Sequence, residues 1–166
     1  MKFYIKQNTA DGKEVFTICN EVGQPVYHVQ SDESTLYSKL TVLDTAENVV
    51  AKINRLGLIG LFRYDINIDD KDCARITQNM TAAGAPRFRI HGVSWHFRGN
   101  MALRSFDVVN VDHTVVMSHG RHWGVNGECF AVDISLPQNA ILCLCIAIVV
   151  DSIVIGSVGA VLPVVN

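Results

Sequence analysis

Three arginine residues have a spacing that suits the binding of a phosphate or carboxylate group. Arg87 and Arg89 alternate with apolar residues, and Arg98 follows after Gly92 and Val93. A tight turn at Gly92 and Val93 would bring the three guanidinium groups onto one face of neighbouring strands. Because guanidinium groups bind such anions through paired hydrogen bonds, these arginines are our candidate ligand site. A solvated outer face of a sheet is the competing interpretation, and the sequence alone favours it.

Histidine, cysteine and aspartate side chains give weaker indications of a site. His119 and His122 are spaced as in some metal sites, but no carboxylate or thiolate accompanies them, so no metal centre is predicted. Cys143 and Cys145 would lie roughly 200° apart on a helix and are interpreted as small core residues. Asp151 interrupts an apolar run. It is either a proton or cation site or a structural residue at the mouth of a barrel, hydrogen-bonded or paired with an arginine, and we favour the structural role.

Motifs of nucleophilic or nucleotide-dependent catalysis do not occur in the chain. There is no GxSxG, no phosphate-binding P-loop and no dinucleotide-binding glycine pattern, so no catalytic residue and no cofactor are predicted. Trp123 stands among Gly120, Gly124 and Gly127, which predicts a loop. Its indole would enter a membrane interface or a partner's groove, or else cover one end of the fold.

The elements that must position these residues are mostly strands. Apolar and polar residues alternate up to residue 134, as in FRYDINI, where Arg63 and Asp65 fall on the polar side. Such alternation is typical of strands with one buried and one solvated face. Turn signals separate them, and similar hairpin units recur along the chain, which favours an up-and-down antiparallel sheet. The predicted strands lie near residues 2–7, 14–19, 25–30, 39–44, 48–54, 61–68, 72–78, 86–91, 94–99, 104–110, 113–119 and 128–134.

The most apolar run, Ala140–Ile155, is either a membrane span or a helix inside the protein. A span needs about 20 apolar residues, and a central carboxylate costs about 2.5–3.5 kcal/mol there. Asp151 interrupts the run, and no lysine or arginine follows Arg121 to orient a span. These features favour the buried helix.

A buried helix also has suitable ends and a suitable place. Ser135 is positioned to cap it, Pro137 is tolerated in its first turn, and Gly156 supplies a stop. Twelve strands enclose a lumen that is wider than side chains alone can fill, and a helix about 10 Å across would fill it. We predict one domain over residues 1–166, with strands over 2–134, a central helix over about 137–155 and an apolar tail over 156–166.

Composition limits the partners and the compartment. The 166 residues are 49% hydrophobic and 18% charged, with a net charge of −2, which predicts a globular chain without general attraction to nucleic acid. An anionic membrane would need a local basic patch. The five cysteines are an odd number without a CxxC pair, and MKFYIKQN lacks the apolar region of a secretory signal. We therefore expect reduced thiols and a cytoplasmic location.

The ordered set of strands and one apolar helix resembles the LURP-one-related (YxjI-like) family of the tubby C-terminal-like superfamily. The resemblance rests on MKFYIKQ, the hairpin units FTICNEVGQPVYHV and LTVLDTAENVVAKI, the strand YDINID and the helix AILCLCIAIVVDSIVI. It covers nearly the whole chain, and phospholipid scramblases are more distantly similar. The resemblance implies a mainly β fold, a barrel of about twelve antiparallel strands closed around a central hydrophobic C-terminal helix.

The resemblance also implies a type of function. Tubby-type domains bind phosphoinositide headgroups through basic residues on the barrel surface, although no residues here match that site one by one. We therefore expect a non-enzymatic binding or scaffold module that docks on anionic phospholipid or on a protein partner, without a transmembrane span. The alternatives are a small-ligand carrier or enzyme with a pocket at a barrel end, and a tail-anchored, scramblase-like membrane protein.

Overall fold

The computed structural model describes residues 1–8, 13–32, 39–57, 62–80, 86–124 and 127–161. Twelve strands precede a short 3-10 helix, Pro137–Asn139, and one α-helix, α1, Ala140–Val161. The prediction of twelve strands followed by a helix is confirmed. The strands are β1 (Lys2–Gln7), β2 (Glu14–Cys19), β3 (Pro25–Ser31), β4 (Lys39–Asp44), β5 (Val49–Leu56), β6 (Phe62–Ile68), β7 (Lys71–Met80), β8 (Pro86–His91), β9 (Trp95–Asn100), β10 (Ser105–Asn110), β11 (Val115–Gly124) and β12 (Gly127–Ile134).

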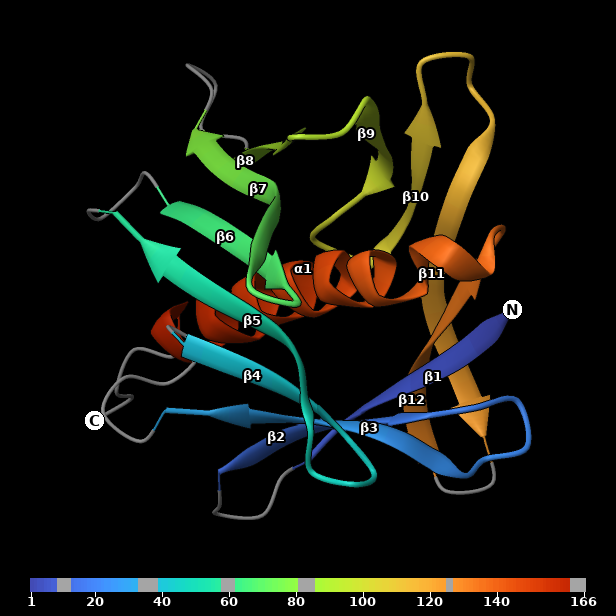
Figure 1. Ribbon diagram of the computed structural model, residues 1–166. Coiled ribbons are helices and arrows are strands. Elements are labelled where there is room, and N and C mark those ends of the chain that lie inside the picture. The colour runs from blue at the N-terminus through green and yellow to red at the C-terminus, as the bar shows by residue number, and fades with distance from the viewer. Residues whose placement is uncertain (9–12, 33–38, 58–61, 81–85, 125–126, 162–166) are drawn as a thin grey trace.

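All twelve strands form one antiparallel sheet that curls around α1 (Figure 1). Each strand pairs with its neighbours in the chain, except that the described residues of β8 and β9 share no ladder and that the first strand, β1, pairs with the last, β12. The register of that closing pair sets Phe3 opposite Val132, which keeps the apolar side chains of both strands on the inner face. The fold is therefore a nearly closed up-and-down barrel.

The barrel has a seam between β8 and β9, the two edge strands of the sheet order. The predicted hairpin at Gly92 and Val93 is therefore wrong, because the two strands share no ladder in the described sheet. Gly92 has a φ of 94° and sits so close to β7 that a Cβ atom would lie 2.9 Å from the Cys73 carbonyl oxygen. The chain thus bends over β7 before it enters β9. Rings of Phe88 and Phe97, with centroids 6.2 Å apart, pack edge to face at the seam.

The inside of the barrel is filled by α1, as predicted. Residues from Cys143 to Val150 are all at most 1% exposed, so every side of this stretch meets the wall. Its side chains pack against the inner faces of strands that include β5, β6, β7 and β12. Each large apolar side chain buried in this way contributes about 1.5–3 kcal/mol. A helix without a polar face suits such a position.

The ends of the helix differ from the prediction. Ser135 does not cap it, since its hydroxyl donates to the carbonyl oxygen of Val115 at 2.7 Å. Gly156 does not stop it either, because α1 continues to Val161. A single glycine costs a helix only about 1 kcal/mol, and the continuation ends two residues before Pro163, whose ring disfavours helical conformation in the preceding residue. The predicted tail thus begins as helix, and residues 162–166 lie outside the described part.

Length and composition alone would allow this helix to span a membrane. The window Pro137–Ile155 has a mean hydropathy of 2.2, but 67% of it is buried inside the protein. The core helix of a barrel passes the same test of length and hydropathy. Burial by the twelve strands therefore accounts for the apolar sequence without a lipid environment.

The thiols of Cys143 and Cys145 should be unreactive in the native protein. Burial raises the pKa of Cys143 to about 12 and raises the pKa of Cys145 as well, so the reactive thiolate is scarce at neutral pH. We expect a disulfide reagent to modify Cys143 and Cys145 only as fast as the protein unfolds. Half-buried Cys73 should react before them and serves as the internal control. Mass spectrometry of timed samples measures both, and rapid labelling of the helix would contradict its seating in the barrel.

Candidate functional site

The arginines of β8 lie on the outer face of the barrel. Ile90 of β8 is buried, while Arg87 and Arg89 are exposed, as strand alternation requires. Pairing with β7 sets Arg87 opposite Asn79 and Arg89 opposite Thr77. Neither guanidinium group forms an ion pair with any residue that the structure describes. Both are therefore available to an external anion.

Arg98 does not join them in the way the sequence suggested. It lies on β9 across the seam, and its Nη2 donates to Asp107 Oδ2 of β10 at 2.8 Å. This hydrogen bond and the positive charge hold the pKa of Asp107 below its usual value, despite an opposing effect of burial. Arg98 therefore already has a carboxylate partner.

Two other arginines lie beside the β8 pair instead. Arg63 of β6 and Arg89 of β8 both lie opposite Thr77 of β7, one on each side of it. Arg75 of β7 lies in the same way between Asp65 of β6 and His91 of β8. One carboxylate serves both, because Asp65 accepts from Arg63 at 3.2 Å and from Arg75 at 2.9 Å. We call the four outward arginines of β6, β7 and β8 the basic surface: Arg63, Arg75, Arg87 and Arg89.

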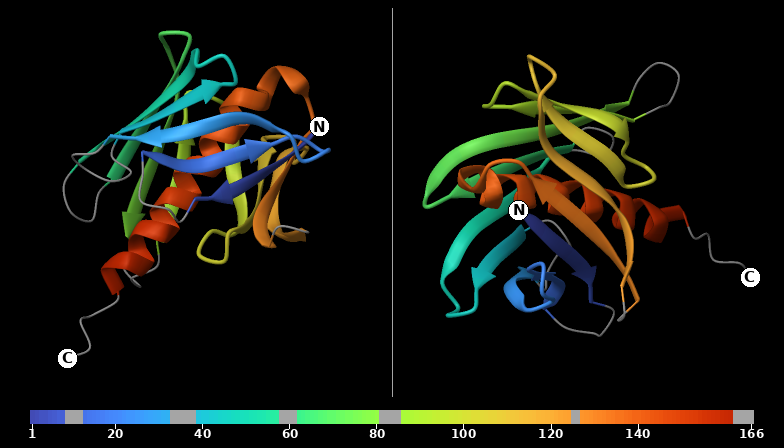
Figure 2. Two further views of the ribbon diagram at one scale, coloured as in Figure 1. Left: turned by 90° about the horizontal axis from the view of Figure 1, so that it is seen from below. Right: turned by 90° about the vertical axis from the view of Figure 1, so that its right-hand side faces the viewer.

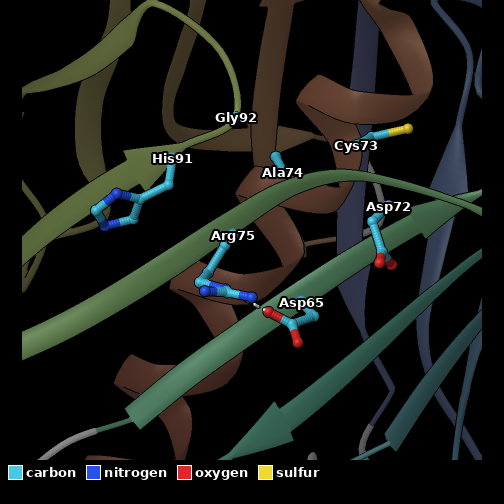
Figure 3. A pocket seen from close by; sticks show the side chains of 7 residues that line it. All are labelled: Asp65, Asp72, Cys73, Ala74, Arg75, His91 and Gly92. Carbon is cyan, nitrogen blue, oxygen red and sulfur yellow. Dashed lines mark hydrogen bonds and ion pairs between the residues drawn. The ribbon is translucent and has the colours of Figure 1, made fainter.

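A hollow of about 320 Å³ borders the basic surface (Figure 3). Within it Arg75 reaches toward Asp65, while His91 and Asp72 point to opposite sides of that ion pair. Thr77 and His91 Nε2 are 3.0 Å apart and form a further hydrogen bond across β7 and β8. Side-chain pairing thus holds the outward groups of these strands in place. The hollow is lined by Asp65, Asp72, Cys73, Ala74, Arg75, His91 and Gly92.

A second group of charges is buried between the wall and the helix. Asp151 of α1 is 0% exposed, and Arg104 Nε donates to its Oδ1 at 2.7 Å. His119 Nε2 lies 3.2 Å from Oδ2 and 3.1 Å from Oδ1 of the same carboxylate. Of the two structural alternatives for Asp151, a hydrogen-bonded residue or a pair with an arginine, the structure shows the pair. We call Arg104, His119 and Asp151 the buried ion network.

The hydrogen bonds of His119 connect the wall of the barrel to the helix. Its Nδ1 is 2.6 Å from the carbonyl oxygen of Arg104, and a carbonyl can only accept, so Nδ1 donates there. Its Nε2 is 3.2 Å from Asp151 Oδ2 on α1. Both ring nitrogens therefore have an oxygen partner, one on the wall and one on the helix.

Aromatic rings enclose the buried ion network. The His119 ring is stacked between Phe106 and Phe130, with centroid distances of 4.6 and 5.2 Å. The Arg104 guanidinium carbon lies 3.5 Å from the centre of the Phe130 ring, which adds a cation–π contact. Arg104 also has a φ of 56°, an uncommon conformation for a residue other than glycine. These contacts fix the geometry, which suits a structural connection between helix and wall.

The remaining candidates are separated or placed differently from expectation. His119 and His122 are both in β11; His119 is buried, whereas His122 is exposed beside Tyr4. Among the residues that the structure describes, no group of three potential metal ligands occurs. Trp123 also belongs to β11, opposite Glu128, where its side chain is 69% exposed. The prediction that Trp123 lies in a loop is wrong, while its exposure agrees with a role at a surface.

Comparison with known proteins places this architecture among relatives. Residues 1–151 match the family model described as LURP-one-related. The chain is 25% identical over 153 residues to the uncharacterized protein YxjI of Bacillus subtilis (strain 168), a match that spans 92% of this chain and 93% of the other. The fold of this chain is similar to that in the X-ray structure of a protein from Arabidopsis thaliana, with a TM-score of 0.58 and 16% sequence identity. The match covers 90% of this chain and 89% of the Arabidopsis chain.

Fold and buried helix together define a barrel of the tubby-like class, with twelve antiparallel strands around one apolar helix. Nearly the full length of the chain contributes to that likeness. Within the class, this chain belongs to the LURP-one-related family.

Proposed function

We propose that the protein is a non-enzymatic binding module that docks on anionic phospholipid headgroups through the basic surface. The observation that supports this most is the state of Arg87 and Arg89, two exposed guanidinium groups without a carboxylate partner among the described residues. A membrane on the cytoplasmic side of the cell is the proposed target, in keeping with five cysteines in the reduced form.

Electrostatics give the proposal a physical basis. Near an anionic bilayer, each lysine or arginine contributes roughly 1 kcal/mol, and the attraction falls off within a Debye length of about 8 Å at physiological salt. Arg63 and Arg75 share Asp65, so this part of the barrel keeps a positive excess although the net charge of the chain is −2. Phosphate oxygens match the paired donors of a guanidinium group.

Removal of Arg87 and Arg89 should weaken vesicle binding about 30-fold, the equivalent of roughly 1 kcal/mol for each arginine. The measurement is co-sedimentation of the Arg87→Ala/Arg89→Ala variant with vesicles of phosphatidylcholine and phosphatidylserine in equal amounts. Vesicles of phosphatidylcholine alone should bind neither protein. High salt should release the unmodified protein, because ions screen exposed charges.

Arg98→Ala is the matched control, since it removes an exposed arginine that already pairs with Asp107. Its binding should stay close to that of the unmodified protein. Binding that is insensitive to salt, or equal in the double variant and the unmodified protein, would rule out this function for the basic surface.

A further inference from the structure

The topology gives the barrel two distinct ends. Strands alternate in direction, so β1, β3, β5, β7, β9 and β11 finish at one end of the barrel, where β2, β4, β6, β8, β10 and β12 begin, and the remaining strand termini lie at the opposite end. The helix begins just after β12 and runs toward the first of these ends, where its last turns project past the strands (Figure 2). We call this the tail end and the other the start end.

Positive charge gathers at the tail end. In the described part of its connections, and in the two strand residues next to them, basic residues outnumber acidic ones. Asp11 and Glu33 belong to the same connections in the sequence, and they do not reverse the balance. The basic residues are Lys6, Lys13, Lys39, Arg55, Arg63 and Arg87, and the acidic ones are Glu14, Asp32 and Glu128; Arg104 is left out because Asp151 balances its charge.

Negative charge gathers at the start end, when charges are again counted in the described connections and in the two strand residues next to them. Lys2 and Lys71 are the basic residues there. The acidic residues are Glu21, Asp44, Glu47, Asp69, Asp70, Asp72, Asp112 and Asp133. The barrel is therefore polarised along α1, and an anionic surface would attract the tail end and repel the start end.

Large apolar groups accompany the positive charge at the tail end. Trp123, near the end of β11, is 69% exposed, and Leu103, in the β9–β10 connection, is 67% exposed. No charged residue occurs in the last turns of α1, from Gly156 to Val161. Exposed apolar groups also occur at the start end, for example Val111 at 70%, but acidic residues outnumber basic ones there.

We infer that the tail end faces the membrane, with Trp123 and Leu103 entering the interface of an anionic bilayer. This inference rests on the proposed function and adds to it an orientation and an apolar contribution. Tryptophan favours the boundary between headgroups and acyl chains, because its ring is apolar and its N–H needs a polar partner. Basic residues around an apolar element are the usual composition of a peripheral membrane contact. Arg63 and Arg87 of the basic surface lie at this end, so these two arginines and the apolar groups reach one bilayer together.

The two tryptophans of the chain allow a direct test, because Trp95 begins β9 at the start end and Trp123 lies at the tail end. The Trp95→Phe variant leaves Trp123 as the only indole. With vesicles of phosphatidylcholine and phosphatidylserine in equal amounts, its emission should shift to shorter wavelength. Brominated acyl chains in the same vesicles should quench it.

The matched control moves the indole to an equally exposed position at the start end. Trp95→Phe/Trp123→Phe/Val111→Trp should co-sediment with the vesicles but show neither the shift nor the quenching. An unshifted, unquenched Trp123 in protein that does co-sediment would overturn the orientation and leave the proposed function standing. A shift of the indole at position 111 would overturn it as well, and failure of every variant to co-sediment would refute both proposals.

Discussion

Replacement of Asp151 by alanine is expected to lower the free energy of unfolding by about 3–5 kcal/mol. The carboxylate is completely buried, accepts a hydrogen bond from Arg104 and contacts His119, so its loss leaves a buried guanidinium group without a counter-charge. Burial in an apolar surrounding makes an unpaired charge costly, because water cannot replace the lost partner. Urea unfolding followed by circular dichroism, with extrapolation to zero denaturant, measures the difference.

Asp107→Ala provides the matched comparison for this variant. It removes the same kind of arginine–aspartate pair, Arg98 with Asp107, from a site where the aspartate side chain is 31% exposed. Exposed pairs contribute about 0–1 kcal/mol, so the loss should be several times smaller. Equal losses of unfolding free energy in the Asp107→Ala and Asp151→Ala variants would contradict our account, in which burial decides the effect of removing a charged partner.

Leu144→Ala and Ile146→Ala should each destabilise the protein by about 2–5 kcal/mol. The two residues lie roughly 200° apart around the helix, yet both are at most 1% exposed. A shortened side chain at either position leaves a cavity that the wall of strands can fill only in part. The same urea experiment applies, and both variants should keep the far-ultraviolet spectrum of the native fold at zero denaturant.

Val22→Ala, at a position 77% exposed, is the control and should change stability by no more than about 0.5 kcal/mol. A helix that lay on the surface would show a large loss on one side and a small loss on the other. A small loss at either Leu144 or Ile146 would therefore be inconsistent with a helix that is enclosed on all sides.

Much of the fold could be predicted from local patterns in the sequence. Alternation identified the strands because a half-buried sheet requires it at every second residue, and FRYDINI indeed places Tyr64 and Ile66 inside. The apolar run with Asp151 identified the helix, since a lumen bounded by twelve strands must be filled. The seam escaped prediction: turn residues such as Gly92 usually join paired strands, and nothing local records that β1 closes on β12 instead.

The sites were less predictable than the elements. Arg63 was recognisable as outward from alternation, but its position next to Arg89 depends on the register of β6, β7 and β8. Arg104 carried no signal at all, because its contact with Asp151 joins residues 47 positions apart and needs a backbone with φ of 56°. Long-range pairing of single side chains leaves no periodic trace in a sequence.

The order of the elements, with α1 after all twelve strands, has a consequence for synthesis on the ribosome. When the twelve strands have been released, the apolar side chains of Phe16, Ile66 and Val132 still lack α1, which follows β12. A nascent chain that stops before residue 140 therefore exposes apolar surface that chaperones and proteases would recognise. Burial of the inner face has to wait until α1 has been synthesised.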